Sequence, residues 1–280
     1  MIFDTNIVPA DLERRFGGLA RLYGSAGARR IRGSHIVVVG VGGVGSWAAE
    51  AVARSGVARL TLIDLDHIAE SNINRQIHAL DTTLGQAKVQ AMRERIARIN
   101  PDCLVTCIEE FVEPANWPDI LALDGGFDRK QLAVIDACDQ VRAKTAMAAW
   151  AVKSKVALIS VGAAGGKRLA HRVDIDDLSL VTHDPLLAQM RYRLRREQGA
   201  ARQGKIGVAC VFSREPVQRP SIECAVDQQE VASPNNLEQT PADLAQTDGS
   251  LNCHGYGSVV SVTSTFGMCA AGWVLDKIAG

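Results

Sequence analysis

A glycine-rich segment and one acidic residue form the clearest candidate for a chemical site in this sequence. Gly40, Gly42, Gly43 and Gly45 stand in a G-V-G-G-V-G run that directly follows a β-branched stretch. Glycines at this spacing permit a tight turn, and they let backbone N–H groups approach a phosphate at the N-terminus of the next helix. Asp64 ends the next apolar run, where a carboxylate can accept hydrogen bonds from ribose hydroxyls. These residues predict a nucleotide site, but an NAD-dependent dehydrogenase would carry the same pattern.

Two cations further along the chain distinguish a catalytic ATP site from the NAD site of a dehydrogenase. Arg75 belongs to the run N-I-N-R-Q at residues 72–76, and Lys88 lies in the first turn of a predicted helix. A dinucleotide held by its pyrophosphate does not need them. A triphosphate attacked at phosphorus does, because negative charge builds on its oxygens and on the leaving pyrophosphate. Either residue alone would more often be a solvated surface charge, but together they favour a catalytic ATP site.

A pair of carboxylates follows the fourth predicted strand in the run D-A-C-D. Carboxyl ends of parallel strands open into the ligand crevice of such folds, and a carboxylate there can hold a Mg²⁺ ion that bridges phosphates. We assign this metal role to Asp139. Asp136 remains open between the same role and that of a cap for the turn.

The elements that must position these residues alternate between strand and helix. Short β-branched runs predict strands at 35–40, 59–64, 104–108, 132–136 and 156–161, and helical patterns lie at 44–55, 85–100 and 141–153. Such alternation predicts an α/β fold with a Rossmann-like, doubly wound and mainly parallel sheet. Beyond residue 162 come a glycine-rich turn, an acidic segment at 174–177, a helix at 185–198 and a polar loop at 227–252.

The C-terminal part ends in an apolar stretch, Gly257–Leu275, that holds no charged residue. The stretch is long enough to span a bilayer, but its serines, threonines and glycines suit close helix packing. We therefore expect a buried or dimer-interface segment, with membrane association as the alternative. The whole chain is expected to be one domain over 1–280, with an ATP-binding core at 15–165 and a substrate and dimerisation lobe at 166–280.

Charge and cysteine content narrow the class of protein. Lys+Arg and Asp+Glu both number 31, so any nucleic-acid surface must be local. The start of the chain carries no long apolar run, which predicts no secretory signal and a cytoplasmic protein. The seven cysteines contain no C-x-x-C pair and are interpreted as reduced, small buried side chains. Cys210 and Cys224 retain a sulfur-relay role as an alternative.

The densest basic cluster lies on the predicted helix at 185–198. It consists of Arg191, Arg193, Arg195 and Arg196. Such a cluster is usually a solvated helix face, but it could also contact the phosphates of an RNA. A second candidate RNA surface lies near Lys167 and Arg168.

The ordered motifs resemble the ubiquitin-activating-like adenylyltransferases, the ThiF/MoeB/HesA family. The resemblance covers about residues 15–165 and implies ATP·Mg²⁺ binding, attack by a carboxylate on the α-phosphate and release of pyrophosphate. It also implies an N-terminal arginine that reaches the nucleotide across a dimer, for which Arg15 or Arg21 is the candidate. The cofactor-binding residues implied are Gly40, Gly42, Gly43, Gly45, Asp64, Asp66, Asn72, Arg75, Lys88, Asp139 and Arg21, of which Arg75, Lys88 and Asp139 would be catalytic.

Within this family the chain is similar to the tRNA threonylcarbamoyladenosine dehydratases. The similar segments include residues 15–24, 43–50, 74–80, 204–208, 210–213 and 265–267. The resemblance implies adenylation of a threonylcarbamoyl carboxylate on a tRNA adenosine beside the anticodon, followed by ring closure with loss of AMP. It further implies a homodimer and sulfur-handling partners of the cysteine desulfurase system.

Two other functions remain open at this point. An activator of a ubiquitin-like sulfur carrier would adenylate a C-terminal glycine, but such activators usually carry two C-x-x-C pairs that are absent here. A non-catalytic, nucleotide-gated binding module is the other alternative. The intact set of Arg75, Lys88 and Asp139 is the feature against it.

Overall fold

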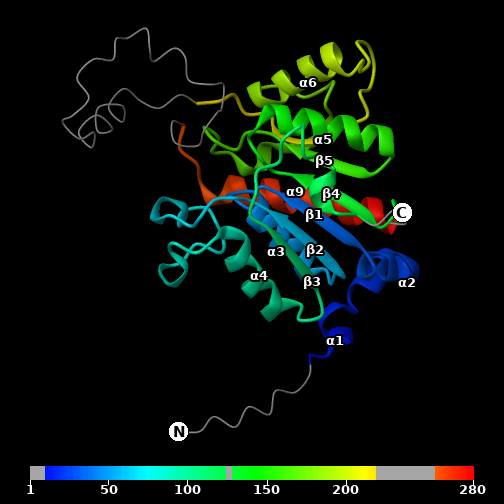
Figure 1. Ribbon diagram of the computed structural model, residues 1–280, viewed down its shortest axis with the longest axis vertical. Coiled ribbons are helices and arrows are strands. Elements are labelled where there is room, and N and C mark those ends of the chain that lie inside the picture. The colour runs from blue at the N-terminus through cyan, green and yellow to red at the C-terminus, as the bar shows by residue number, and fades with distance from the viewer. Residues whose placement is uncertain (1–9, 124–127, 219–255) are drawn as a thin grey trace, which may run out of the picture.

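The protein is built around one seven-stranded sheet (Figure 1). The computed structural model describes residues 10–123, 128–218 and 256–280. The strand order is β3-β2-β1-β4-β5-β7-β6. All neighbouring strands are parallel except β6, which runs antiparallel to β7. The strands are β1 His35–Val39, β2 Arg59–Ile63, β3 Leu104–Ile108, β4 Leu132–Asp136, β5 Ala157–Val161, β6 Val173–Asp177 and β7 Ala209–Ser213.

Helices cover both faces of this sheet, as a doubly wound fold requires. On β1, Ile36 and Val38 pack into one core and Val37 and Val39 into another, because successive side chains of a strand point to opposite faces. The first core also contains residues of α2, α3, α4 and α9, and the second those of α5 and α6. The helix bounds are α1 Leu12–Phe16, α2 Leu19–Arg32, α3 Gly45–Arg54, α4 Lys88–Ile99, α5 Val141–Ser154, α6 Pro185–Glu197 and α9 Val260–Ala279.

The apolar C-terminal stretch forms α9, which lies across the sheet and against α3. Phe266, Ala270 and Val274 on this helix are fully buried. Gly267 allows a close crossing, since a Cβ there would lie 2.9 Å from the backbone nitrogen of Ala48. The expectation of a buried segment is confirmed. Across the described ranges, no helix combines the length and apolar character that a bilayer crossing requires.

The predicted α/β class is confirmed, and the remaining differences lie mainly after residue 162. The helix expected at 85–100 begins only at Lys88. The acidic segment at 174–177 is part of β6, and β7 was not predicted as a strand. Alternating carboxylates suit an edge strand, where they discourage pairing with another chain. β6 and β7 extend the same sheet as the nucleotide core, so the boundary of a separate lobe stays a prediction. The polar loop at 227–252 lies outside the described residues.

Candidate nucleotide-binding site

The glycine run lies where the strand order of the sheet reverses. β2 and β3 lie on one side of β1, and β4 lies on its other side. In open α/β sheets, ligands bind outside the carboxyl ends of the strands at such a switch point. The loops after β1 and β4 meet here: a Cβ at Gly40 would lie 2.9 Å from the backbone nitrogen of Cys138. The fold therefore opens its crevice beside the predicted phosphate cradle.

Two glycines of the cradle have no substitute. Gly40 adopts φ +82°, a left-handed conformation that residues with a Cβ avoid. A Cβ at Gly45 would overlap the Gly40 carbonyl oxygen. This tight turn leads the chain directly into α3. The cradle thus brings backbone N–H groups and the positive end of the helix dipole together, which is how helix N-termini bind phosphate.

The end of β2 supplies a carboxylate held against this cradle. Asp64 Oδ2 accepts a hydrogen bond from the Val41 N–H at 2.6 Å, and its Oδ1 accepts one from the Asp66 N–H at 2.9 Å. Burial raises the pKa of the Asp64 carboxyl, and the nearby charge of Lys88 counteracts part of this rise. Asp64 therefore lies beside the cradle, where the sequence predicted a ribose partner.

Lys88 starts α4 and is held by Asp66. Its Nζ lies 2.6 Å from Asp66 Oδ2, and its backbone N–H donates to the Asp66 carbonyl at 3.0 Å. The lysine side chain is only 8% exposed, whereas the Asp66 side chain is 57% exposed. The Lys88 ammonium is thus buried near Asp64 and paired with the solvent-exposed carboxylate of Asp66. An anionic ligand can approach the ammonium from the side of Asp66.

Arg75 lies directly over the glycine run. Its Cγ would lie 3.3 Å from a Cβ at Gly43. Its backbone carbonyl accepts a hydrogen bond from Trp47 Nε1 of α3 at 2.9 Å, and Nη1 donates to Asn74 Oδ1 at 2.9 Å. Asn74 in turn donates from Nδ2 to the Ser258 carbonyl just before α9. Trp47 therefore positions Arg75, a role that the sequence analysis missed because it quoted Trp47 only within a family motif.

The neighbours of Arg75 in the N-I-N-R-Q run have different environments. Asn72 is buried, and its Oδ1 accepts from the Ala69 N–H at 3.1 Å, so it stabilises the loop; its contact with a cofactor stays a prediction. Gln76 is also buried, and its Oε1 has no hydrogen-bond partner among the described residues. Its amide nitrogen would lie 4.0 Å from a Cβ at Gly42. Gln76 is a site residue that the sequence analysis did not select, although its place beside Arg75 was the available signal.

The two carboxylates after β4 have opposite environments. Asp136 is fully buried, with Oδ2 3.0 Å from Lys144 Nζ and 2.6 Å from Ser160 Oγ. It therefore does not face the crevice, but its Oδ1 accepts a hydrogen bond from Cys138 Sγ in the following turn at 3.2 Å. Asp139 is exposed, one residue after the Cys138 nitrogen that lies beside Gly40. No cluster of three metal-ligating side chains occurs in the described part of the chain. A single free carboxylate fits a Mg²⁺ that takes its other ligands from phosphates and water.

The remaining predicted residues lie away from the cradle. Arg21 is exposed on α2. Helix α2 leads into the start of β1, whereas the glycine run follows the end of β1 (Figure 1). The contribution of Arg21 from a second copy stays a prediction. The alternative RNA surface near Lys167 is wrong for Lys167 itself, because this side chain is buried and donates to the carbonyls of His183 and Glu215.

The arginines of α6 are largely occupied by partners of their own. Arg191 donates to the carbonyls of Leu178 and Val181, and Arg193 lies 3.1 Å from Glu197. Arg196 lies over the ring of Tyr192 (5.6 Å from Cζ to the centroid). Contacts between this cluster and RNA stay a prediction, and Arg191 is the member least available for them.

Of the cysteines that the structure describes, Cys210 is buried as expected, and Cys103, Cys107, Cys138 and Cys269 are only partly buried. Burial raises the pKa of the Cys103 thiol to about 11, and it also raises the pKa of Cys138 and Cys210. A protonated, buried thiol is a poor nucleophile, which argues against a sulfur-relay role for Cys210. Cys224 and Cys253 lie outside the described residues.

A Rossmann-like sheet with a glycine cradle, an arginine and a lysine beside it defines a nucleotide-binding protein, and comparison with known families agrees. Residues 16–280 match the model of the ThiF family. The chain therefore belongs to the ThiF family.

Two relatives that match nearly the whole chain carry the same name. The tRNA threonylcarbamoyladenosine dehydratases of Haemophilus influenzae and of Escherichia coli K12 are each 39% identical to this chain, over 95% and 98% of its length and 94% and 97% of theirs. The crystal structure of the E. coli enzyme, TcdA, in complex with ATP aligns with a TM-score of 0.77 at 38% identity, covering 97% of both chains. The E. coli MccB structure with ATP, at 13% identity and a TM-score of 0.58 over 95% of this chain and 63% of that one, shares the fold alone.

Proposed function

We propose that this protein is an ATP-dependent tRNA threonylcarbamoyladenosine dehydratase. The observation that carries the proposal is the placement of Arg75 and Lys88 around the glycine cradle at the switch point of the sheet. This placement occurs in a chain that matches enzymes of that name over nearly its whole length. Two cations at the cradle can stabilise the negative charge that develops when a nucleophile attacks a triphosphate, whereas a bound dinucleotide does not need them.

In the first step the nucleotide is held and activated. The N–H groups of residues 42–45 bind phosphate oxygens at the start of α3, since those of Gly40 and Val41 donate to the Ile63 carbonyl and to Asp64. Asp64 binds the ribose. The threonylcarbamoyl carboxylate attacks the α-phosphorus of ATP, so that an acyl adenylate forms and pyrophosphate leaves. Arg75 and Lys88 stabilise the charge that builds on the phosphate oxygens in this step.

Entry of the triphosphate changes the partner of Lys88. In the nucleotide-free arrangement its ammonium contacts the solvent-exposed carboxylate of Asp66. A phosphate oxygen can compete for the same ammonium, because the Asp66 carboxylate is 57% exposed and is solvated by water when the pair separates. Asp66 therefore holds Lys88 beside the cradle, and little free energy is needed to exchange Asp66 for a phosphate oxygen.

In the second step the substrate itself is the nucleophile. The ureido group of the modified adenosine attacks the activated carbonyl carbon, the ring closes, a proton is lost and AMP leaves. The net change is the loss of one water from the nucleoside, with ATP converted to AMP and pyrophosphate. No enzyme thiol is required, which fits the raised pKa that burial gives the thiols of Cys138 and Cys210.

The proposal includes a metal ion and several partners. Asp139 would hold Mg²⁺, which would supply positive charge to neutralise the leaving pyrophosphate. A homodimer would bring Arg21 of one copy to the cradle of the other. Proteins of a cysteine desulfurase system are candidate partners, and the cytoplasm is the expected location because the tRNA substrate is there.

The direct test is incubation of the protein with ATP, Mg²⁺ and tRNA purified from a strain that lacks this enzyme. Nucleoside mass analysis is expected to show that threonylcarbamoyladenosine loses the mass of one water. Omission of ATP and use of tRNA without the modification are the controls. An unchanged nucleoside under conditions where the protein binds ATP would contradict the proposal, and adenylation of a carrier protein would then be tested.

A further inference from the structure

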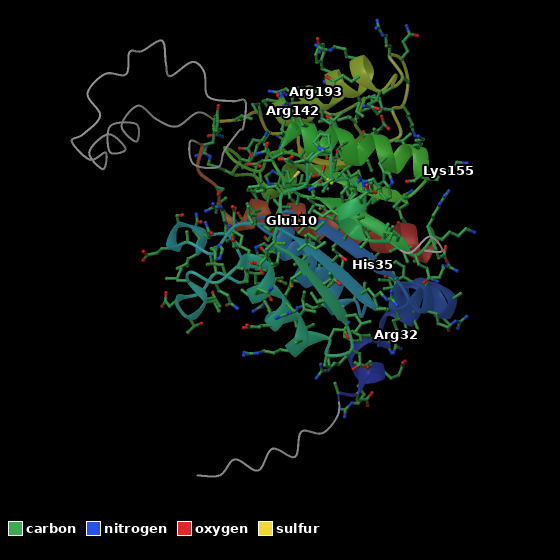
Figure 2. The ribbon with its side chains drawn as sticks, in the orientation of Figure 1. Arg32, His35, Glu110, Arg142, Lys155 and Arg193 are labelled. Carbon is green, nitrogen blue, oxygen red and sulfur yellow. The ribbon has the colours of Figure 1, made fainter. Side chains whose placement is uncertain are left out.

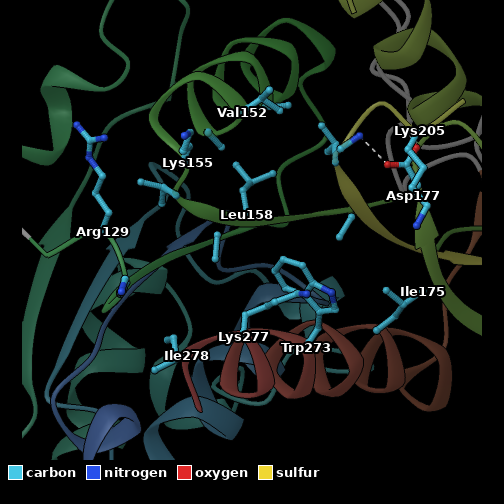
Figure 3. A pocket seen from close by; sticks show the side chains of 18 of the residues that line it. Arg129, Val152, Lys155, Leu158, Ile175, Asp177, Lys205, Trp273, Lys277 and Ile278 are labelled. Atoms are coloured by element: carbon cyan, nitrogen blue, oxygen red, sulfur yellow. Dashed lines mark hydrogen bonds between the residues drawn. The ribbon is translucent and has the colours of Figure 1, made fainter. Parts of the chain in front are cut away.

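A second, strongly basic pocket lies at the opposite edge of the sheet. It opens between α5 and α9, at the ends of β5, β6 and β7, with a volume of about 920 Å³ (Figure 3). Figure 2 shows Lys155 of this pocket on the same side of the molecule as His35, the first residue of β1. The glycine cradle follows the last residue of β1, so five strand residues, or about 17 Å, separate the two edges. The pocket is therefore distinct from the nucleotide site.

Six cationic side chains line the pocket, against two carboxylates. Arg30 donates to the carbonyls of Ile278 and Ala279 at the end of α9. The other five have no salt bridge and no side-chain hydrogen bond to any residue that the structure describes. These are Arg129, Lys130, Lys155, Lys205 and Lys277, which we call the edge cations.

The two carboxylates do not neutralise this set. Asp177 accepts hydrogen bonds from the N–H groups of Ile206 and Gly207, which lower the pKa of its carboxyl and hold the loop that carries Lys205 (dashed line in Figure 3). Asp176 accepts from the Asp177 N–H. Both therefore shape the pocket wall, and neither forms an ion pair with an edge cation.

Local structure explains only part of this accumulation of charge. Lys155 follows α5 and Lys277 lies in the last turn of α9, where a cation favourably opposes the helix dipole. Arg129, Lys130 and Lys205 lie outside helices and have no such reason. The chain as a whole carries equal numbers of basic and acidic residues, 31 of each. Lys277 Nζ lies over the Trp273 ring, 5.5 Å from its centroid, so four edge cations have no side-chain partner among the described residues. This local excess of positive charge points to an anionic ligand.

We propose that this pocket binds backbone phosphates of the tRNA substrate, as an anchor separate from the nucleotide site. The proposal rests on the proposed function, which requires the protein to hold a polyanion much larger than the reacting nucleoside. Nucleic acid carries a charge every few ångströms, so an RNA seated at the crevice has further phosphates within reach of an edge about 17 Å away. Lysines on loops and helix ends suit such contacts, because phosphate binding needs charge more than fixed geometry.

A second copy of this chain fits the pocket less well. In a two-fold interface the same patch faces itself, and the edge cations would then face one another. Like charges brought together in this way cost free energy. Free phosphate or nucleotide shares the required chemistry, and the experiment must separate it from RNA.

The experiment compares two double variants with the wild type. Lys155→Ala with Lys205→Ala removes two edge cations. Arg93→Ala with Arg98→Ala removes two exposed charges of α4 that form no salt bridge in the described residues, and it is the matched control. Affinity for tRNA is measured across a salt series, affinity for ATP and for inorganic pyrophosphate is measured by calorimetry, and mass is measured by sedimentation.

The edge variant is expected to bind tRNA about 10-fold to 100-fold more weakly at low salt. The slope of log affinity against log salt concentration should be less steep by about one to two, because tRNA binding releases fewer counterions when phosphate contacts are lost. The control should keep the wild-type slope, and ATP affinity should be unchanged in both. Binding of unmodified tRNA is the readout, so this result does not depend on whether the protein dehydrates the nucleoside.

Three results would overturn the proposal. Equal slopes for the edge variant and the wild type would show that tRNA does not contact the pocket. A loss of pyrophosphate or ATP affinity with tRNA affinity intact would make it a site for free phosphates. A change in mass with unchanged tRNA binding would make it an interface between copies. Failure of the wild type to dehydrate modified tRNA, with the salt effect intact, would instead contradict the proposed function.

Discussion

Two lysine–aspartate pairs in this protein use the same residue types for different purposes. Lys144 and Asp136 lie 3.0 Å apart with both side chains fully buried, and Lys88 and Asp66 lie 2.6 Å apart with the carboxylate 57% exposed. The Lys144 ammonium also donates to the Val161 carbonyl at 2.8 Å, which joins β4, β5 and α5. The first pair stabilises the fold, whereas the second keeps a cation ready for an incoming phosphate. The degree to which solvent reaches the aspartate distinguishes the two roles.

The strongest test of this contrast is removal of the buried lysine. Lys144→Met leaves Asp136 buried without its cation, so the free energy of unfolding is expected to fall by about 3–5 kcal/mol. Urea denaturation followed by circular dichroism measures the change. The double variant Lys144→Met with Asp136→Leu should recover much of the loss, because no unpaired charge remains. A single variant as stable as the wild type would show that the pair is not structural.

Removal of Lys88, whose partner Asp66 is exposed, should slow turnover rather than destabilise the fold. Lys88→Met is expected to slow AMP formation by about 10²–10³-fold, the usual effect of losing a transition-state charge partner, and Arg75→Met should behave similarly. The exposed partner makes the stability change small, at most about 1 kcal/mol. Nucleotide affinity should fall less than turnover. If Lys88→Met destabilised the fold as much as Lys144→Met, the contrast between the two pairs would be lost.

His78, a buried histidine whose pKa Lys88 influences, provides a test of the pH dependence of stability. His78 is 2% exposed, neither ring nitrogen has a partner among the described residues, and burial, then Lys88 and Arg95, lower its pKa from 6.5 to about 4. The unfolded chain therefore binds this proton first as the pH falls. Between about pH 6.5 and about pH 4 the histidine should progressively remove about 3 kcal/mol of stability.

The measurement compares wild type with His78→Phe by urea denaturation across this pH range. The difference between their unfolding free energies should vary with pH below about 6.5 and be constant above it. Adding Lys88→Met should reduce the pH-dependent part, because one of the charges that lowers the histidine pKa is gone. A pH-independent difference would mean that His78 does not remain neutral in the folded protein.

The sequence was sufficient to predict the parts of the site that depend on local pattern. The glycine run, the strands that precede it and Lys88 at the start of a helix follow from spacing and periodicity. The metal role was assigned to Asp139 from the sequence, but the role of Asp136 in the same D-A-C-D run stayed open, because only the packing of α5 buries it beside Lys144. The role of Trp47 likewise depends on a contact with a distant loop. β6 was not predicted as a strand because residues 174–177 were noted only for their acidic side chains, although acidic residues are typical of an edge strand.

The basic pocket was beyond sequence reasoning for the same physical cause. Its edge cations are separated along the chain, from Arg129 to Lys277, and no local pattern joins them. The arginines of α6 form a dense local cluster that the sequence does reveal, yet the structure pairs several of them internally. Local charge density was therefore a poor guide to which cations are free.

The account's central claim is that the cradle transfers AMP to a carboxylate of the tRNA. The most direct measurement follows ATP labelled at the α-phosphate during a single incubation with tRNA that carries threonylcarbamoyladenosine. The account predicts that AMP and pyrophosphate form in equal amounts, in proportion to the nucleoside that loses water, and only when the modified tRNA is present. Formation of ADP and phosphate, or of AMP without dehydrated nucleoside when modified tRNA is supplied, would contradict it.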